Sequence, residues 1–193
     1  MKNNSLTLKI LVIFFYYFFQ FNYSLAKDLN FKASEIFTYE EGNLVVGNKN
    51  AEAKIEDELM IYADKFTYNR NKETLIAEGN VKVEDLINQI NIQSNKIFYD
   101  KILNKIISYD KTNFVVNKIY KINSSDVNFL LNDSIIFSNK STELKDNENN
   151  KMHLESFKYF NQTEIIKGEN IKLIDNEGNS YFVNQGMLKL QDY

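Results

Sequence analysis

Residues 59–85 read LMIYADKFTYNRNKETLIAEGNVKVED, and this stretch decides the fold. Two runs rich in β-branched and aromatic residues, 59–68 and 74–85, flank a polar segment with the composition of a turn. The second run alternates apolar and polar residues from Leu75 to Val83, as a half-buried strand does. The stretch therefore predicts two strands joined by a turn.

The first run carries a pattern that recurs along the chain: apolar, any, small, any, any, apolar, any, aromatic. Its members here are Ile61, Ala63, Phe66 and Tyr68. Further copies occupy 92–99, 122–129 and 152–159, and a looser copy occupies 31–38. The third position falls at residues 33, 63, 94, 124 and 154, so the period is 30 or 31 residues. Such self-similarity is typical of folds in which stacked copies share one interior.

The alternation breaks at one place in each copy. The step from Ala63 to Phe66 is three residues, so a strict period of two would put Ile61 and Phe66 on opposite faces. One extra residue, as a bulge or a bend, returns both to the same face. Because the break recurs in every copy, we expect a bend in each of these strands.

The remaining segments complete the predicted architecture. Second strands are expected at 44–47, 75–83, 106–114, 136–144 and 165–173, and a last strand at 181–190. Proline is absent, which removes the strongest strand breaker, and helical periodicity is lacking after the N-terminus. We therefore predict an all-β fold, a solenoid-like stack of antiparallel strands built from repeats of about 30 residues.

Residues 1–26 differ from the rest of the chain. Lys2 and Lys9 are their charged side chains, Ile10 to Phe19 is an unbroken apolar run, and Ser24-Leu25-Ala26 is a small-x-small cleavage site. These features predict a secretory signal peptide, with an uncleaved membrane anchor as the alternative. Residues 27–193 then form one domain with a net charge of −5, which argues against a nucleic-acid surface.

The inventory of catalytic side chains is thin. Cysteine is absent and His153 is the single histidine, so a His/Cys nucleophilic site is excluded. The acidic run 56–58 is interpreted as a solvated turn rather than a metal site. Carboxylate pairs could form between Asp64 and Glu78, or between Glu164 and Glu169, but these acids lie on predicted polar faces. We expect neither an enzyme nor a cofactor or metal site.

The apolar interior leaves two interpretations open. It is either a filled core that holds the fold together, as in a structural or adhesive solenoid, or an open trough for an apolar ligand. Burial stabilises by about 0.8 kcal/mol per methylene, so a trough could hold acyl chains without specific polar contacts. The open ends of such a stack could also pair with another chain by strand addition.

The pattern A-D-x-φ-x-Y followed by A-x-G-N-V resembles the OstA family of lipopolysaccharide-transport proteins, which includes LptA, LptC and the N-terminal domain of LptD. The resemblance spans about residues 31–190 and is most specific at Ala63-Asp64, Tyr68-Asn69 and 77–81. Later repeats keep the apolar positions and lose these letters. The pair Tyr99-Asp100 and the fifth repeat look closest to the LptD domain, with an LptA-like bridge protein as the alternative and an LptC-like protein if the N-terminus is retained.

The resemblance implies a twisted β-jellyroll that shields lipopolysaccharide acyl chains and docks end to end with other Lpt-type proteins in the periplasm, with an outer-membrane barrel as a possible further partner. The residues it implies for the trough share an inward position. They are Ile61, Ala63, Phe66, Tyr68, Leu75, Ala77, Val81, Val83, Ile92, Ile97 and Tyr99.

Overall fold

A computed structural model describes residues 29–55 and 59–190, and the predicted signal peptide and the acidic run 56–58 lie outside them. The described residues form one 15-stranded sheet in which every pairing is antiparallel. The strands are β1 (Leu29–Lys32), β2 (Glu35–Tyr39), β3 (Leu44–Ile55), β4 (Leu59–Asn69), β5 (Thr74–Asp85), β6 (Ile90–Asp100), β7 (Lys105–Val116), β8 (Tyr120–Ser125), β9 (Asn128–Leu130), β10 (Ile135–Ser138), β11 (Thr142–Lys145), β12 (Lys151–Leu154), β13 (Ser156–Phe160), β14 (Ile165–Ile174) and β15 (Ser180–Lys189). The predicted all-β fold is confirmed.

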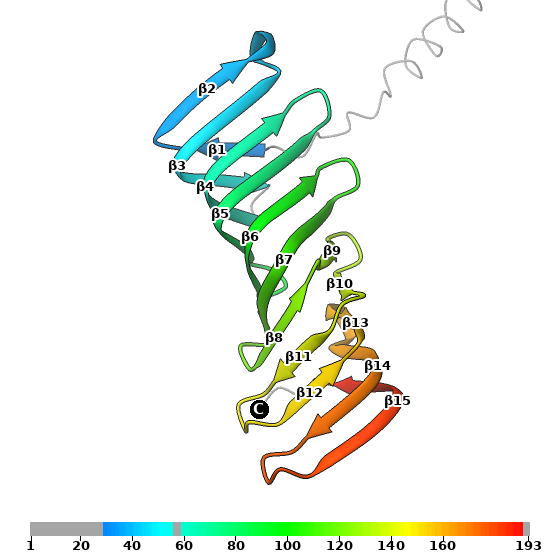
Figure 1. Ribbon diagram of the computed structural model, residues 1–193. Coiled ribbons are helices and arrows are strands. Elements are labelled where there is room, and N and C mark those ends of the chain that lie inside the picture. The colour runs from blue at the N-terminus through cyan, green and yellow to red at the C-terminus, as the bar shows by residue number, and fades with distance from the viewer. Residues whose placement is uncertain (1–28, 56–58, 191–193) are drawn as a thin grey trace, which may run out of the picture.

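The sheet is folded over on itself into two layers (Figure 1). Layer A contains β1, β8, β11 and β12, and layer B contains β2, β9, β10 and β13. The longer strands β3–β7, β14 and β15 run through both layers, so each pass of the chain crosses from one layer to the other. The strands follow one another along the axis of the stack almost in sequence order, which gives a jellyroll-like meander with an apolar interior.

A line of bulges forms the crease between the layers. The strand registers shift between Asn48 and Ala51, between Tyr62 and Lys65, and between Glu78 and Val81. Along this line Asn50, Asn80, Asp110 and Asn170 adopt positive φ, a conformation that asparagine and aspartate tolerate better than most residues. Ile61, Ala63 and Phe66 are all buried in spite of the three-residue step. The bend expected from the broken alternation is therefore confirmed in β4 and β6. In the other three copies the strand is divided at that place, into β1 and β2, β8 and β9, and β12 and β13.

Two expectations about the bounds of the second strands of the repeats were wrong. The second strand of the first repeat does not end at Gly47: β3 continues through the crease to Ile55, because the bulge at Lys49–Asn50 interrupts the register without ending the pairing. The expected strand 136–144 is divided into β10 and β11, with a break at residues 139–141. There Ser138 donates to the carbonyl of Ser125 (2.6 Å) and Thr142 donates to that of Lys140 (2.9 Å), so side chains take over backbone pairing at the crease.

Candidate functional site

Two rows of inward-facing side chains line the interior in strand register. The row in layer A begins at the N-terminal end of the stack and ends at β15. It consists of Phe31, Ala53, Ile61, Val83, Ile92, Phe114, Ile122, Leu144, Met152, Leu173 and Tyr181. The facing row in layer B consists of Thr38, Val45, Tyr68, Leu75, Tyr99, Ile106, Phe129, Ile136, Tyr159, Ile166 and Leu188. Each strand that runs through both layers adds one side chain to each row, and each shorter strand adds one side chain to the row of its own layer. The interior is therefore apolar along almost its whole length.

The eleven residues implied by the family resemblance all belong to this interior. Ten of them are buried: Ile61, Ala63, Phe66, Leu75, Ala77, Val81, Val83, Ile92, Ile97 and Tyr99. Tyr68 is half-buried and packs against the core, with its ring centroid 5.7 Å from that of Phe31. The structure therefore brings the eleven together, while their contact with a lipid stays a prediction.

Ring contacts join the two layers across the interior. Phe114 of layer A stacks on Phe157 of layer B with 5.7 Å between ring centroids. Phe31 of β1 likewise meets Tyr68 of β4. In both pairs the layer B residue comes from a strand later in the chain, so the layers are offset along the stack. Phe114, Phe129, Tyr99 and Tyr159 are fully buried, and large rings therefore fill the middle of the interior.

Hydrogen bonds between turns close the middle of the interior along its open side. Asn88, in the turn between β5 and β6, accepts hydrogen bonds from Ser134 Oγ (3.3 Å) and Asn161 Nδ2 (2.9 Å). Asn88 is held by Asp85, whose carboxylate accepts from its backbone and side-chain amides at 2.8 and 2.7 Å. Asn117 Nδ2 also donates to Glu164 at 3.1 Å. We call these contacts between turns of the two layers the seam.

An apolar opening lies between the layers near the C-terminal end. It has a volume of about 390 Å³ and is lined on the inside by Tyr120, Leu144, Met152, Leu173 and Leu188. Its outer margin carries Asp146, Asn150, Lys151 and Lys189. The opening therefore has an apolar floor and a polar margin that carries two lysines and one aspartate.

Both ends of the stack expose residues from inward-facing positions. Ile36 in β2 is 50% exposed, and Tyr181 and Val183 in β15 are 52% and 49% exposed. Among the described residues β15 pairs with β14 alone, and β2 pairs with β3 alone, so each has an unpaired backbone edge. These edges are able to accept another strand.

The acids and the histidine singled out from the sequence do not converge on one site. Asp64 pairs with Asn80 and Glu78 with Lys96, while Glu164 accepts from Asn117 and Glu169 from Ser156. His153 faces outward on layer A, 3.8 Å from Glu143. Within residues 29–55 and 59–190, no group of three or more acids and histidines is placed to hold a metal ion. In the same part of the chain no helix has the length and apolarity to span a membrane.

Sequence reasoning missed the residues of the seam, and it did not predict that later inward positions meet at the C-terminal opening. Asn88 lies 73 residues from Asn161, and no periodic pattern relates them. Leu144, Met152 and Leu173 were recognisable as inward positions of later repeats. Leu188 joins them because β15 brings it back beside Ile166.

Comparisons with known proteins give a structural likeness only. No protein-family model matches the chain, and no curated protein matches it. The fold is similar to the crystal structure of LptH from Pseudomonas aeruginosa, the LptA-homologous periplasmic component of the conserved lipopolysaccharide transport device. The match covers 77% of this chain and 94% of LptH, with 10% sequence identity and a TM-score of 0.45.

Proposed function

We propose that this chain is a periplasmic lipopolysaccharide-transport module that holds acyl chains between the two layers of its folded sheet. The observation that carries this function is the pair of inward apolar rows, which run the length of the stack and reach an apolar opening at its C-terminal end. We take lipopolysaccharide as the cargo because the sequence pattern around Ala63-Asp64 and 77–81 resembles that of the OstA family.

Loading requires the seam to part, because large rings occupy the middle of the interior. The seam consists of a few side-chain hydrogen bonds, each worth about 1 kcal/mol net. Acyl chains that take the place of interior contacts made by Tyr99 or Phe129 would offset the cost of breaking the seam hydrogen bonds, since each buried methylene contributes about 0.8 kcal/mol. The layers would then separate on the seam side while the crease acts as the hinge.

Photo-crosslinking tests the cargo. A photoreactive amino acid at Phe66 or Ile97 is expected to label lipopolysaccharide, because both side chains are buried between the layers. The same group at Lys82, on the outer face of layer A, is the matched control and is expected to remain unlabelled. Labelling confined to the Lys82 variant would overturn the transport function.

A structural role with a sealed core is the second candidate function. The full burial of Phe114, Phe129, Tyr99 and Tyr159 favours it, because a filled interior has no room for a ligand unless it opens. This function predicts that the purified chain carries no lipid and that neither interior position is labelled. The same crosslinking experiment therefore separates the two functions.

The unpaired edges of β2 and β15 support end-to-end docking with another jellyroll of the same kind. A partner strand beside β15 would cover Tyr181 and Val183 and extend the inward rows into the next molecule. Replacing Asn184 by proline should weaken self-association or partner binding, since the ring removes a backbone donor. Proline at Asn147, in the turn between β11 and β12, is the control and should leave association unchanged.

A further inference from the structure

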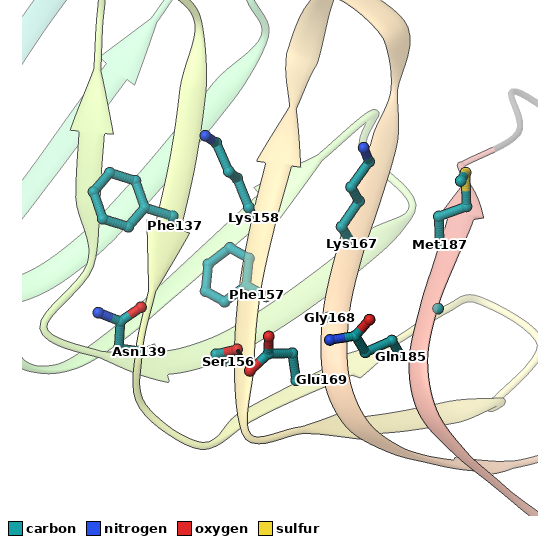
Figure 2. A pocket seen from close by; sticks show the side chains of 11 residues that line it. Phe137, Asn139, Ser156, Phe157, Lys158, Lys167, Gly168, Glu169, Gln185 and Met187 are labelled. Atoms are coloured by element: carbon teal, nitrogen blue, oxygen red, sulfur yellow. Dashed lines mark hydrogen bonds between the residues drawn. The ribbon is translucent and has the colours of Figure 1, made fainter.

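A groove crosses the outer face of layer B at the C-terminal end of the stack (Figure 2). It runs over β10, β13, β14 and β15 and has a volume of about 510 Å³. One wall is a row in strand register: Phe137, Lys158, Lys167 and Met187. The opposite wall includes Ser156 and Glu169, and Ser156 Oγ donates to Glu169 at 3.4 Å. The groove lies on the opposite face of the sheet from the interior.

Lys158 and Lys167 form a pair of cations in this wall, and neither has an ion-pair partner among the described residues. They stand directly opposite each other on β13 and β14, an arrangement in which like charges destabilise a sheet. Within the described ranges neither lysine lies within 4.0 Å of a carboxylate oxygen, whereas Lys96 and Lys101 on the same layer pair with Glu78 (2.8 Å) and Glu73 (2.7 Å). An anion between the two ammonium groups would relieve their repulsion.

Aromatic and thioether groups border this pair of cations. The Phe160 ring lies 5.1 Å from Lys158 Nζ and 5.3 Å from Lys167 Nζ, which holds both ammonium groups over the same side of the sheet. Phe137 stands on one side of the lysines and Met187, which is 70% exposed, on the other. The wall therefore presents positive charge between two apolar side chains.

The other layer offers a natural comparison. Lys121, Lys145 and Lys151 also stand in one register row, on the outer face of layer A. Their neighbours along that row are Val115 and Ile174. Lys151 lies at the margin of the C-terminal opening, whereas Lys121 and Lys145 line none of the grooves described for residues 29–55 and 59–190. The outer faces of both layers thus carry rows of lysines, and layer B combines its lysine pair with apolar neighbours and a groove.

We infer that the groove binds the phosphate-bearing head group of an anionic lipid. The phosphate lies between Lys158 and Lys167, away from the carboxylate of Glu169, and the first acyl carbons lie on Phe137 and Met187. This site goes beyond the proposed transport function, because its ligand is held outside the sheet and makes no use of the interior rows. Each of the two sites can therefore fail without the other.

Methionine methyl resonances provide a local test. The chain has four methionines, and among those described Met187 lies in the groove, Met152 at the C-terminal opening of the interior and Met60 on the outer face of layer A. The full chain, labelled with ¹³C at its methionine methyl groups, is titrated with monomeric dihexanoyl phosphatidylglycerol, and Met187→Leu assigns the resonance. A saturable shift at Met187, with Met60 and Met152 unmoved, is the expected result.

Matched variants establish what the groove recognises. Lys158→Gln with Lys167→Gln is expected to weaken binding by about tenfold, the effect of losing two exposed ion pairs. Lys121→Gln with Lys145→Gln removes the same charge from layer A and should leave the affinity unchanged. Dihexanoyl phosphatidylcholine, which has no net charge, should shift Met187 far less than the phosphatidylglycerol does.

Each other outcome overturns the assignment. An equal shift with inorganic phosphate alone would identify a free-anion site without a lipid. Equal weakening by the two lysine pairs would reduce the effect to net charge. A shift at Met152 with Met187 unmoved would place the lipid in the interior, which would support the transport function and rule out the outer site. Unchanged spectra at every methionine would also rule out the outer site.

Discussion

Asn80 donates a hydrogen bond from its side-chain amide to the carboxylate of Asp64 on the neighbouring strand, at 2.9 Å. Both residues lie on the crease, where Asn80 has a φ of 47° and Gly79 a φ of 77°. A Cβ atom at Gly79 would collide with the side chain of Asp64, whose Cβ atom would lie 2.9 Å away. Ala63-Asp64 and Gly79-Asn80 therefore belong to one bend. Gly79 leaves room for the Asp64 side chain, and Asn80 forms a hydrogen bond with Asp64.

The first prediction concerns Gly79. Gly79→Ala should lower the free energy of unfolding by about 1–3 kcal/mol, since it adds a strained φ and a clash with Asp64. Gly178→Ala is the control, because Gly178 has a φ of +92° and no atom within 4 Å of a Cβ, so it isolates the strain. Urea denaturation measures both. In an Asp64→Ala background the cost of Gly79→Ala should approach that of Gly178→Ala, and equal costs in every background would contradict the clash.

A second prediction tests the packing of the interior. Ile97→Ala should lower the free energy of unfolding by about 2–5 kcal/mol, because Ile97 is fully buried and its removal leaves a cavity. Ile87→Ala makes the same chemical change in a turn where the side chain is 60% exposed, and should cost no more than about 0.5 kcal/mol. Similar losses for the two variants, measured by urea denaturation, would show that the interior is not close-packed.

The third prediction concerns the seam. Asn88→Ala removes the acceptor shared by Ser134 and Asn161, and should speed amide hydrogen exchange in the turns 131–134 and 161–164. Gln89→Ala changes an exposed neighbour and is the control. If lipid enters by this side, Asn88→Ala should also accelerate lipopolysaccharide uptake. Faster exchange with unchanged uptake would show that the seam opens but is not the route of entry.

A fourth prediction is the pH dependence of the contact between Glu78 and Lys96. The hydrogen bond from Lys96 holds the pKa of Glu78 below its ordinary value, and the ammonium charges of Lys96 and Lys65 act in the same direction. The stability that this contributes is present at neutral pH and is lost as the pH falls through the lowered pKa of Glu78. The melting temperature of Glu78→Gln should therefore lie slightly below that of the wild type at pH 7 and converge with it in acid. A difference that grows in acid would have the wrong sign for this contact.

The repeat made the fold predictable, because one bend with the same spacing occurs five times and the strand period leaves a single way to keep Ile61 and Phe66 on one face. The inward positions of the eleven residues agree with the same alternation, while their assignment to a trough came from the family resemblance. The break at residues 139–141 was not predictable, since it depends on hydrogen bonds from Ser138 and Thr142 to backbone carbonyls. Local composition alone could not distinguish this interruption from a bulge.

The sequence by itself determined which side chains face inward, where each strand bends and how the strands follow one another, because these depend on contacts between neighbours in a periodic chain. Only the tertiary structure decided how far the layers are offset, which brings Asn88 to Asn161 and Phe114 to Phe157. That offset joins side chains from strands far apart in the sequence, so no single repeat encodes it. For the same reason the outer groove, whose wall joins residues from β10, β13, β14 and β15, exists only once the sheet is assembled.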